Sequence, residues 1–347
     1  MNRAGGLLLA AGLFGATLQQ TASAQDRVIP NLPRGVTEEV RKSSKRGLEY
    51  LSREQHRDGS WRHGGSYGHY PVAMTGLAGL ALVGSGSTPT RGPYSKHVRL
   101  ATRYLIKMQQ PNGLITAPNE ESRSMYGHGF STLFLAQVYG MEEDVAMQRR
   151  LRLVLRKAVV LIERSQSVRG GWLYTPDSRG DEGSVTVTQV QALRACRNAG
   201  IYVPKKTIGD AIGYLKKCQN ADGGISYSVN HRSSRPALTA AACAVLYNAG
   251  AYDSDMATKA WEYAWRHAKP SGGRGHWFYT QLYMSQATWQ KGGKFWDEYY
   301  SEIRDRLIAI QQGNGSWRGD GAGLVYGTAI ALLIMQLPYN HLPILSR

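Results

Sequence analysis

The chain has 347 residues, 42% of them hydrophobic, and a formal net charge of +17. This length and apolar content provide for one large or two small packed domains, so a chain that stays unfolded is excluded. Beyond the first residues, no stretch approaches the roughly 20 apolar residues needed to cross a bilayer, which excludes an integral membrane protein. The strong positive charge predicts anionic partners, such as envelope lipid head groups or an acidic glycan surface.

The start of the chain has the three parts of a secretory signal peptide. Arg3 supplies a positive charge, an apolar stretch covers residues 4–18, and residues 22–24 (Ala-Ser-Ala) form a small-residue cleavage site. We therefore expect cleavage near Ala24, an N-terminal linker over residues 25–37, and a secreted or periplasmic protein without a transmembrane segment. Export argues against a nucleic-acid partner, as does the lack of a zinc-finger or helix-turn-helix signature.

From residue 38 onward one pattern occurs six times. It consists of an amphipathic segment, a Gln or His, a short polar turn, a Gly and often a Trp. The first copy reads KRGLEYLSREQHRDGSW over residues 45–61, and the last reads RDRLIAIQQGNGSWRGD over residues 304–320. The marker positions are Gln55, Gln110, Gln166, Gln219, His267 and Gln311, at intervals of 44 to 56 residues. Such regular spacing indicates a repeated structural unit.

Each unit predicts two helices of different character. The first helix has charged residues between apolar positions at i, i+3 and i+4, and it ends at the Gly-rich turn. The second helix is apolar nearly all round. These apolar helices are expected over residues 71–84, 129–140, 184–200, 236–250, 277–289 and 325–337.

The contrast between the two helix types predicts a closed ring. A helix with one apolar stripe lies at a surface, whereas a helix that is apolar on all sides is buried between neighbours. An open solenoid would need a polar capping repeat at its end, and the apolar helix over 325–337 is a poor cap. We therefore predict an all-α fold, an (α/α)6 toroid over residues 38–347. In it, the Gln of each unit would pair with open backbone groups at a neighbouring helix end, with the Trp stacked on the Gln.

The repeat resembles that of a known superfamily. Its pattern, [KR]-[GA]-x2-[FYW]-L-x3-Q-x(2–5)-G-x-W, is similar to the QW repeat of squalene–hopene cyclases and related triterpene cyclases. The first unit matches it at Arg46, Gly47, Tyr50, Leu51, Gln55, Gly59 and Trp61. Protein prenyltransferase β subunits contain the same ring. The resemblance covers roughly residues 38–340 and implies a toroid whose ligand is an isoprenoid.

The catalytic motifs of these families are not matched. Terpene cyclases of class II protonate an alkene with the central Asp of Asp-x-Asp-Asp, and the aligned residues 182–185 place Ser184 at that position. The prenyltransferases hold zinc with Asp, Cys and His, and here Tyr279 stands where the His would be, with no Cys near Asp181. We therefore expect no metal or other cofactor.

Chemistry in a toroid is expected where the N-termini of the apolar helices ring one mouth of the barrel. This region is rich in phenols, with one acidic pair, imidazoles and arginines. The catalytic candidates are Asp181, Glu182, His128 and Tyr279. The ligand-binding candidates are Tyr70, Arg123, Tyr126, Ser184, Arg235, His276, Trp277, Tyr283 and Tyr326.

Three functions remain open on these residues. The first is a cyclase- or prenyltransferase-like protein that holds an apolar, isoprenoid or lipid-like molecule in its central cavity, with or without catalysis. The second is a polysaccharide-active (α/α)6 enzyme, a lyase or hydrolase, acting on acidic glycans with paired carboxylates or a Tyr/His base. The third is a non-catalytic scaffold for a protein partner.

Two further features concern the exterior and the redox state. Basic clusters at residues 41–46, 149–152 and 205–206 are interpreted as solvated helix faces. Cys196, Cys218 and Cys243 lie in helical contexts, which favours buried free thiols over a Cys196–Cys218 disulfide.

Overall fold

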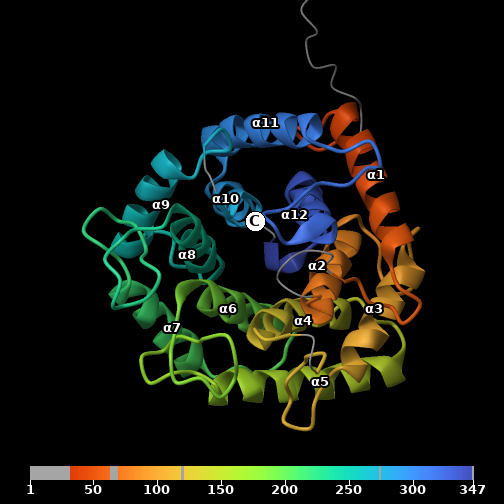
Figure 1. Cartoon of the computed structure of the whole chain (residues 1–347), viewed down its shortest axis with the longest axis horizontal. Helices are drawn as coiled ribbons and strands as arrows, with labels where there is room; N and C mark the ends of the chain where they lie inside the picture. Colours follow the sequence, from red (N-terminus) through yellow and green to blue (C-terminus); the bar gives the residue numbers. More distant parts are fainter. Residues whose placement is uncertain (1–31, 63–68, 119–120, 273–274, 346–347) are drawn as a thin grey trace, which may run out of the picture.

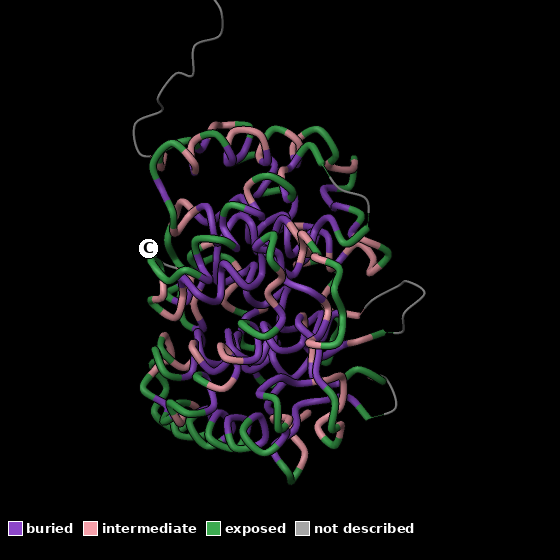
Figure 2. The backbone as a smooth tube through the Cα atoms, turned by 90° about the vertical axis from the view of Figure 1, so that its left-hand side faces the viewer, coloured by how far each residue is buried: buried purple, intermediate pink, exposed green. Residues whose placement is uncertain are grey.

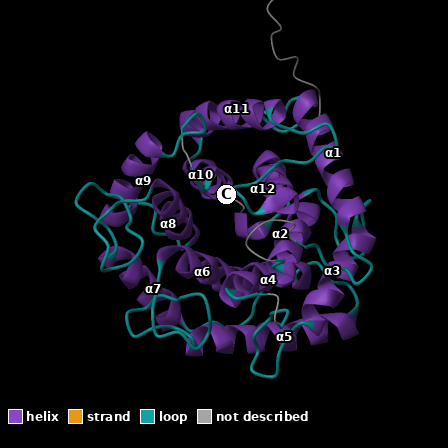
Figure 3. Cartoon of the chain, viewed as in Figure 1, coloured by secondary structure: helices purple, strands orange, loops and turns teal. Residues whose placement is uncertain are grey.

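The computed structural model describes residues 32–62, 69–118, 121–272 and 275–345, and the predicted signal peptide lies outside them. The described residues form twelve α-helices and no β-strand beyond isolated bridges (Figure 3). Six helices form an outer layer: α1 (Glu38–Glu54), α3 (Ser95–Lys107), α5 (Val145–Arg164), α7 (Lys205–Lys217), α9 (Asp255–His267) and α11 (Gly293–Ala309). Six form an inner layer: α2 (Pro71–Gly84), α4 (Ser124–Tyr139), α6 (Gly183–Asn198), α8 (Pro236–Asn248), α10 (Trp277–Lys291) and α12 (Gly323–Gln336).

The two layers form a closed ring, which confirms the predicted toroid (Figure 1). α12 of the last unit packs against α2 of the first, and α1 contacts both α11 and α12. Burial follows the predicted contrast, because the inner helices are enclosed and the outer ones expose one face (Figure 2). All residues of α2 are buried, whereas α1 buries only one stripe. One inner helix differs from its predicted range: α4 begins at Ser124, five residues before the expected start at 129.

The marker glutamines join consecutive outer helices. Each side-chain amide donates to the carbonyl of the turn Gly four residues later and to a carbonyl of the next outer helix, at 2.8–3.2 Å. The five pairs on the next helix are Gln55 with His97, Gln109 with Val154, Gln166 with Thr207, Gln219 with Met256, and Gln311 with Ser43. The last pair runs from the sixth unit to the first and therefore closes the ring.

Two predicted markers are corrected by these contacts. In the second unit the bridging residue is Gln109, because its amide and not that of Gln110 reaches Val154. In the fifth unit His267 packs its ring on Tyr263, with ring centroids 4.4 Å apart, and makes no such bridge. There the guanidinium of Arg306 on the next outer helix donates to the carbonyl of Pro270 instead.

The turn glycines are required by close backbone contact. Gly59 has φ +94, and a Cβ atom there would lie 2.3 Å from the carbonyl oxygen of Leu100 on the next outer helix. Gly170 repeats this arrangement against Asp210, at 2.2 Å. Only a residue without a side chain fits both the left-handed conformation and the contact. The turn can therefore press against the next helix, which brings the marker glutamine within reach.

The repeat tryptophans do not stack on the glutamines as predicted, but tie each outer helix to its own inner helix. The indole N–H groups of Trp61, Trp172 and Trp317 donate to carbonyls in the last turn of α1, α5 and α11, at 2.7–2.8 Å. Their backbone N–H groups donate to the hydroxyls of Thr75, Thr186 and Thr328 on the inner helices, each at 3.0 Å. All three rings are fully buried. Loss of such a residue costs about 3–5 kcal/mol in a packed core.

The interior is chemically quiet around the cysteines. Cys196, Cys218 and Cys243 are buried free thiols, and burial raises the pKa of Cys196 to about 12. A thiol with a raised pKa carries little thiolate and is unreactive. Within the described residues, no helix has the length and apolar character of a membrane span.

Candidate functional site

The inner helices all run in the same direction, because an antiparallel outer helix separates each from the next. Their N-termini therefore lie at one end of the barrel, where the positive ends of the helix dipoles attract carboxylates. Glu182 is the N-cap of α6, and its carboxylate accepts from the backbone N–H groups of Ser184 at 2.8 Å and Val185 at 2.6 Å. This mouth is the region that the sequence analysis selected.

Glu182 also bonds to side chains of the mouth. Its carboxylate accepts from the Ser184 hydroxyl at 2.7 Å and from the Tyr126 hydroxyl of α4 at 3.4 Å. The Tyr126 and Ser184 hydroxyls are hydrogen-bonded to each other. Glu182 is fully buried, and this burial raises its pKa, although the four hydrogen-bond donors act against the rise.

Two tyrosines of α10 and one of α12 complete the group. The rings of Tyr279 and Tyr283 meet edge to face, with centroids 4.8 Å apart. Their hydroxyl oxygens are buried and have no hydrogen-bond partner among the described residues. Tyr326 lies near Tyr279 and Tyr283, and burial raises the pKa of Tyr283 to about 12. We call Tyr126, Glu182, Ser184, Tyr279, Tyr283 and Tyr326 the mouth cluster.

Solvent reaches the top of the mouth cluster but not its base. The side chains of Tyr126, Ser184, Tyr279 and Tyr326 are partly exposed, whereas Glu182 and Tyr283 are buried. Below Tyr283, the amide of Gln191 on α6 donates to the amide oxygen of Gln286 on α10 at 2.7 Å. Both glutamines are buried, so a polar bridge crosses the barrel beneath the cluster.

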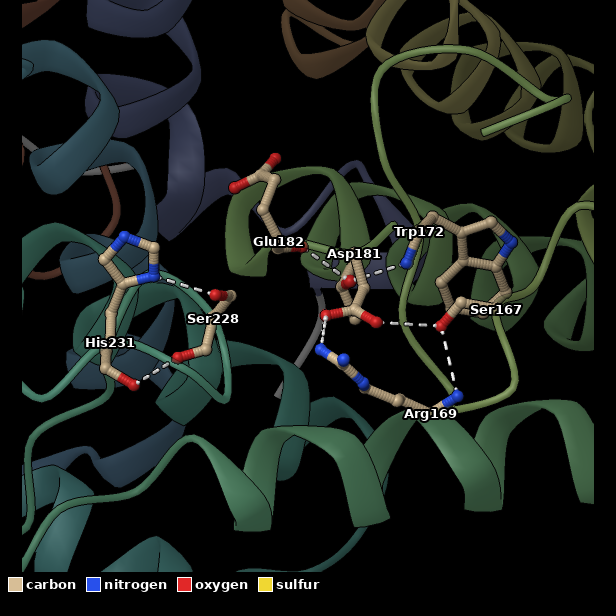
Figure 4. Close-up of polar contacts among 9 residues, drawn as sticks. Ser167, Arg169, Trp172, Asp181, Glu182, Ser228 and His231 are labelled. Carbon is tan, nitrogen blue, oxygen red and sulfur yellow. Dashed lines mark hydrogen bonds and ion pairs between the residues drawn. The ribbon is translucent and has the colours of Figure 1, made fainter. Parts of the chain in front are cut away.

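The two neighbouring carboxyl groups of the predicted acidic pair point in opposite directions (Figure 4). Glu182 is directed into the mouth. Asp181 faces the outer layer, where it accepts from the Ser167 hydroxyl at 3.1 Å and lies 3.9 Å from the Arg169 guanidinium. The extended backbone at Glu182, with φ −152 and ψ 159, explains this divergence, because successive side chains of an extended chain alternate. The structure therefore places only Glu182 in the mouth cluster.

Two other candidates are used by the fold. His128 is fully buried between α4 and α5, where Nδ1 accepts from the Ile115 N–H at 3.0 Å and Nε2 lies 3.3 Å from the Ala158 carbonyl. Burial lowers the pKa of His128 to about 4. Trp277 is buried outside the mouth, with its indole donating to the Pro270 carbonyl at 3.0 Å. His128 thus takes the position that Thr75 and Thr186 hold in other units.

The remaining candidates form a rim around the mouth. Tyr70 and His276 precede α2 and α10 with φ values of 39 and 36, which are strained for residues with a side chain. Arg123 precedes α4, and its guanidinium carbon lies 4.5 Å from the ring centre of Tyr174. Arg235 precedes α8. The side chains of Arg123, Arg235 and His276 are exposed, so the rim carries mobile positive charge above the phenols.

Sequence reasoning missed two tyrosines next to the mouth cluster. The hydroxyls of Tyr174 and Tyr227 are hydrogen-bonded to each other, and the ring of Tyr174 lies 6.0 Å from that of Tyr126. Both occupy the same repeat position, three residues after the second Gly in GGWLY (170–174) and GGISY (223–227). The register of the repeats could therefore have identified them.

It also missed two carboxylates that cap helices of neighbouring units. Glu121 accepts from the Val72 N–H of α2 at 2.8 Å, and Asp320 accepts from the Tyr279 N–H of α10 at 3.1 Å. Burial raises the pKa of both groups, that of Glu121 to about 7. With Glu182 on α6, a carboxylate caps every second inner helix. No sequence signal marks the first two, because each lies far along the chain from the helix that it caps.

A Ser–His pair lies beside the mouth in the α7–α8 loop (Figure 4). The Ser228 hydroxyl is 2.8 Å from Nδ1 of His231, and the His231 N–H donates to the Ser228 carbonyl at 3.0 Å. No carboxylate of a described residue pairs with His231. The contact is explained by the local turn and does not form a nucleophile–base–acid triad.

Comparison with known proteins gives a likeness of fold alone. No family model matches the chain, and no curated protein matches it in sequence. Among solved structures, a protein from Actinoplanes has 16% identity and a TM-score of 0.60, covering 88% of this chain and 99% of that one. Type II terpene cyclase MstE from Scytonema has 16% identity and a TM-score of 0.57, covering 88% and 99%. The GH76A α-1,6-mannanase from Salegentibacter sp. HEL1_6 has 8% identity and a TM-score of 0.60, covering 86% and 98%. These likenesses support an (α/α)6 toroid.

Proposed function

We propose that the protein is an exported toroid that binds an apolar, isoprenoid- or lipid-like molecule at the barrel mouth, with a polar group of that molecule in the mouth cluster. The observation that carries this proposal is the pair of buried, unpartnered hydroxyls on Tyr279 and Tyr283. A buried polar group without a partner costs about 1–3 kcal/mol, so a ligand group that bonds to it gains that amount on binding.

The shape and chemistry of the mouth suit such a ligand. The partly exposed rings of Tyr126, Tyr279 and Tyr326 offer apolar faces to an isoprenoid chain. The Gln191–Gln286 bridge crosses the barrel beneath them, so the ligand would lie above it. A hydroxyl or carbonyl group at the deep end would meet Tyr283. The exposed arginines of the rim would attract an anionic head group at the other end.

Glu182 is the residue to test for catalysis. It is the one carboxylate of the mouth cluster, and its raised pKa keeps a larger protonated fraction near neutral pH. Supporting chemistry comes from MstE, a toroid that has been solved in complex with geranylgeranyl dihydroxybenzoate described as its substrate. Against an acid role, Glu182 already accepts two backbone N–H groups as a helix cap. Binding is therefore proposed independently of catalysis.

A glycan-active enzyme is the second candidate, supported by the basic, aromatic rim. Arg123 stacked on Tyr174 and the exposed Arg235 are side chains that suit an acidic sugar. A mannanase variant with two consecutive aspartates replaced is described as inactive and was solved with α-1,6-mannotriose. Here the consecutive carboxyl groups of Asp181 and Glu182 diverge, which does not favour a carboxylate pair across a groove.

Extraction of the purified protein separates these functions. Mass spectrometry of an organic extract should show a co-purified lipid in the wild type, and less of it in Tyr279→Phe/Tyr283→Phe. In parallel, uronate polymers should remain intact. Depolymerisation of such polymers that Tyr279→Phe abolishes would replace the first proposal by the second. Neither lipid nor depolymerisation would leave a scaffold for a protein partner.

A further inference from the structure

The outward face of α5 carries the densest positive charge of the outer wall. α5 is the longest helix of the described chain, with 20 residues. Six exposed cations lie on it: Arg149, Arg150, Arg152, Arg156, Lys157 and Arg164. At 100° per residue they fall within one face, and Glu163 is the one carboxylate among them. We call this set of six cations the α5 basic face.

The α5 basic face is not neutralised by the protein itself. None of its six cations forms an ion pair with a described residue. By contrast, α1, α7, α9 and α11 each pair a cation with a nearby carboxylate, as in Arg41–Glu38, Lys206–Asp210, Lys259–Asp255 and Arg304–Asp305. The acids before α5 are engaged elsewhere, because Glu143 pairs with Arg91 at 3.1 Å and Asp144 caps the helix. The charge of this face is therefore available to a partner.

Exposed apolar side chains lie among these cations. Val145 is 59% exposed, Leu153 is 61% exposed and Val160 is 41% exposed, all on the same outward face. Val168, just beyond the C-terminus of α5, is fully exposed. A solvated helix face gains nothing from such residues. Cations combined with exposed aliphatic groups are the composition of a surface that lies against lipid head groups.

We propose that the α5 basic face is a docking surface for an anionic phospholipid membrane. Each cation near an anionic lipid surface contributes about 1 kcal/mol, and the aliphatic side chains add burial at the boundary between head groups and acyl chains. An acidic polymer would use the same charges. It would not use Leu153 or Val160, and it would favour the stripe of Lys96, Arg99, Arg103 and Lys107 on α3 equally. The apolar residues on α5 therefore decide for lipid.

The location fits attachment to a surface from the side of the ring. α5 lies on the outer wall (Figure 1), so a membrane against it leaves the barrel mouth uncovered. The proposal is independent of what the mouth binds. It would remain if the mouth were empty, and it could fail while the mouth binds a ligand.

Vesicle co-sedimentation of the mature chain tests the docking surface. Wild-type protein should bind vesicles of phosphatidylcholine with one quarter phosphatidylglycerol, and should bind pure phosphatidylcholine weakly. Arg149→Gln/Arg152→Gln/Arg156→Gln should weaken partitioning on the order of 100-fold, from about 1 kcal/mol per cation. A control with the same loss of charge on another wall, Lys42→Gln/Lys45→Gln/Arg57→Gln, should weaken it less than tenfold.

The apolar contribution is tested at constant charge. Leu153→Ser/Val160→Ser should weaken vesicle binding about tenfold and should leave binding to a soluble polyuronate unchanged. The matched control is Ile310→Ser, which changes an exposed apolar residue of α11. All these positions are exposed, so far-ultraviolet circular dichroism should show an intact fold.

Three results would overturn the proposal. The first is no binding to anionic vesicles. The second is an equal loss in the α1 control, which would show that diffuse charge and not this face is responsible. The third is α5-dependent binding to the polyuronate without binding to vesicles, which would assign the face to an acidic polymer.

Discussion

The side chain of Gln311 bonds twice to Ser43, across 268 positions of sequence. Its amide donates to the Ser43 carbonyl at 3.0 Å, and its oxygen accepts from the Ser43 hydroxyl at 2.8 Å. The same amide donates to the Gly315 carbonyl at 2.9 Å. One residue thereby holds the sixth unit to the first, and the ring closes through the contact that elsewhere joins neighbours.

Replacing this residue should weaken ring closure. Gln311→Leu removes these hydrogen bonds and leaves the Ser43 hydroxyl without its acceptor, so the free energy of unfolding should fall by about 2–3 kcal/mol. Urea denaturation measures the change. Gln312→Leu is the neighbouring control, and an equal loss in both variants would contradict the assigned role of Gln311.

The bridge of the second unit offers a sharper comparison, because the sequence pattern and the structure select different residues. Gln109→Leu should cost about 2 kcal/mol, since the amide bonds to the carbonyls of Gly113 and Val154 are lost. Gln110→Leu should cost less than about 0.5 kcal/mol, as is usual for a substitution away from such contacts. Thermal unfolding of both variants checks the assignment, and the reverse order would restore Gln110 as the marker.

His128 should make the protein sensitive to acid. Its pKa of about 4 lies below the ordinary value of 6.5, so the unfolded chain binds the proton more readily. Its stabilising contribution is therefore complete above pH 6.5 and is lost as the pH falls through 4, by up to about 3 kcal/mol. His128→Thr introduces the residue of the other units and should flatten this dependence. Unfolding free energies measured across this range check it, and an unchanged slope in the variant would contradict it.

Glu121 should give the opposite trend. Its pKa is raised to about 7 by burial, so its contribution is complete below the ordinary value of 4.5 and is lost as the pH rises through 7. Glu121→Gln imitates the protonated acid. The variant should gain up to about 3 kcal/mol relative to the wild type between these limits. A difference that is independent of pH would show that Glu121 stays ionised throughout.

The repeat made the fold predictable from the chain alone. Alternating charged and apolar helices with regular Gly turns determine both layers, and the apolar helix over 325–337 requires a partner at the other end of the chain. The details of the turns were less accessible. Adjacent glutamines at 109 and 110 carry the same chemistry, and only the phase of the helix end decides which of them reaches Val154.

The candidate site was predictable in location but not in side-chain direction. The helix starts indicated Tyr126, Glu182 and Tyr279 correctly as neighbours. The divergence of Asp181 from Glu182 depends on one extended residue, which no periodic pattern encodes. His128 was selected because imidazoles are often catalytic, whereas its repeat position, shared with threonines that bond to a turn, indicates a structural role.

Titration of a C20 prenyl alcohol into the protein, followed by native mass spectrometry, tests the mouth most directly. The wild type should form a one-to-one complex, and Tyr279→Phe/Tyr283→Phe should bind at least about tenfold more weakly, because two hydrogen-bonding hydroxyls are lost. Tyr202→Phe, an exposed tyrosine far from the cluster in sequence, should bind as the wild type does. No complex with the wild type, or equal affinity in the double variant, would contradict ligand binding at the mouth cluster.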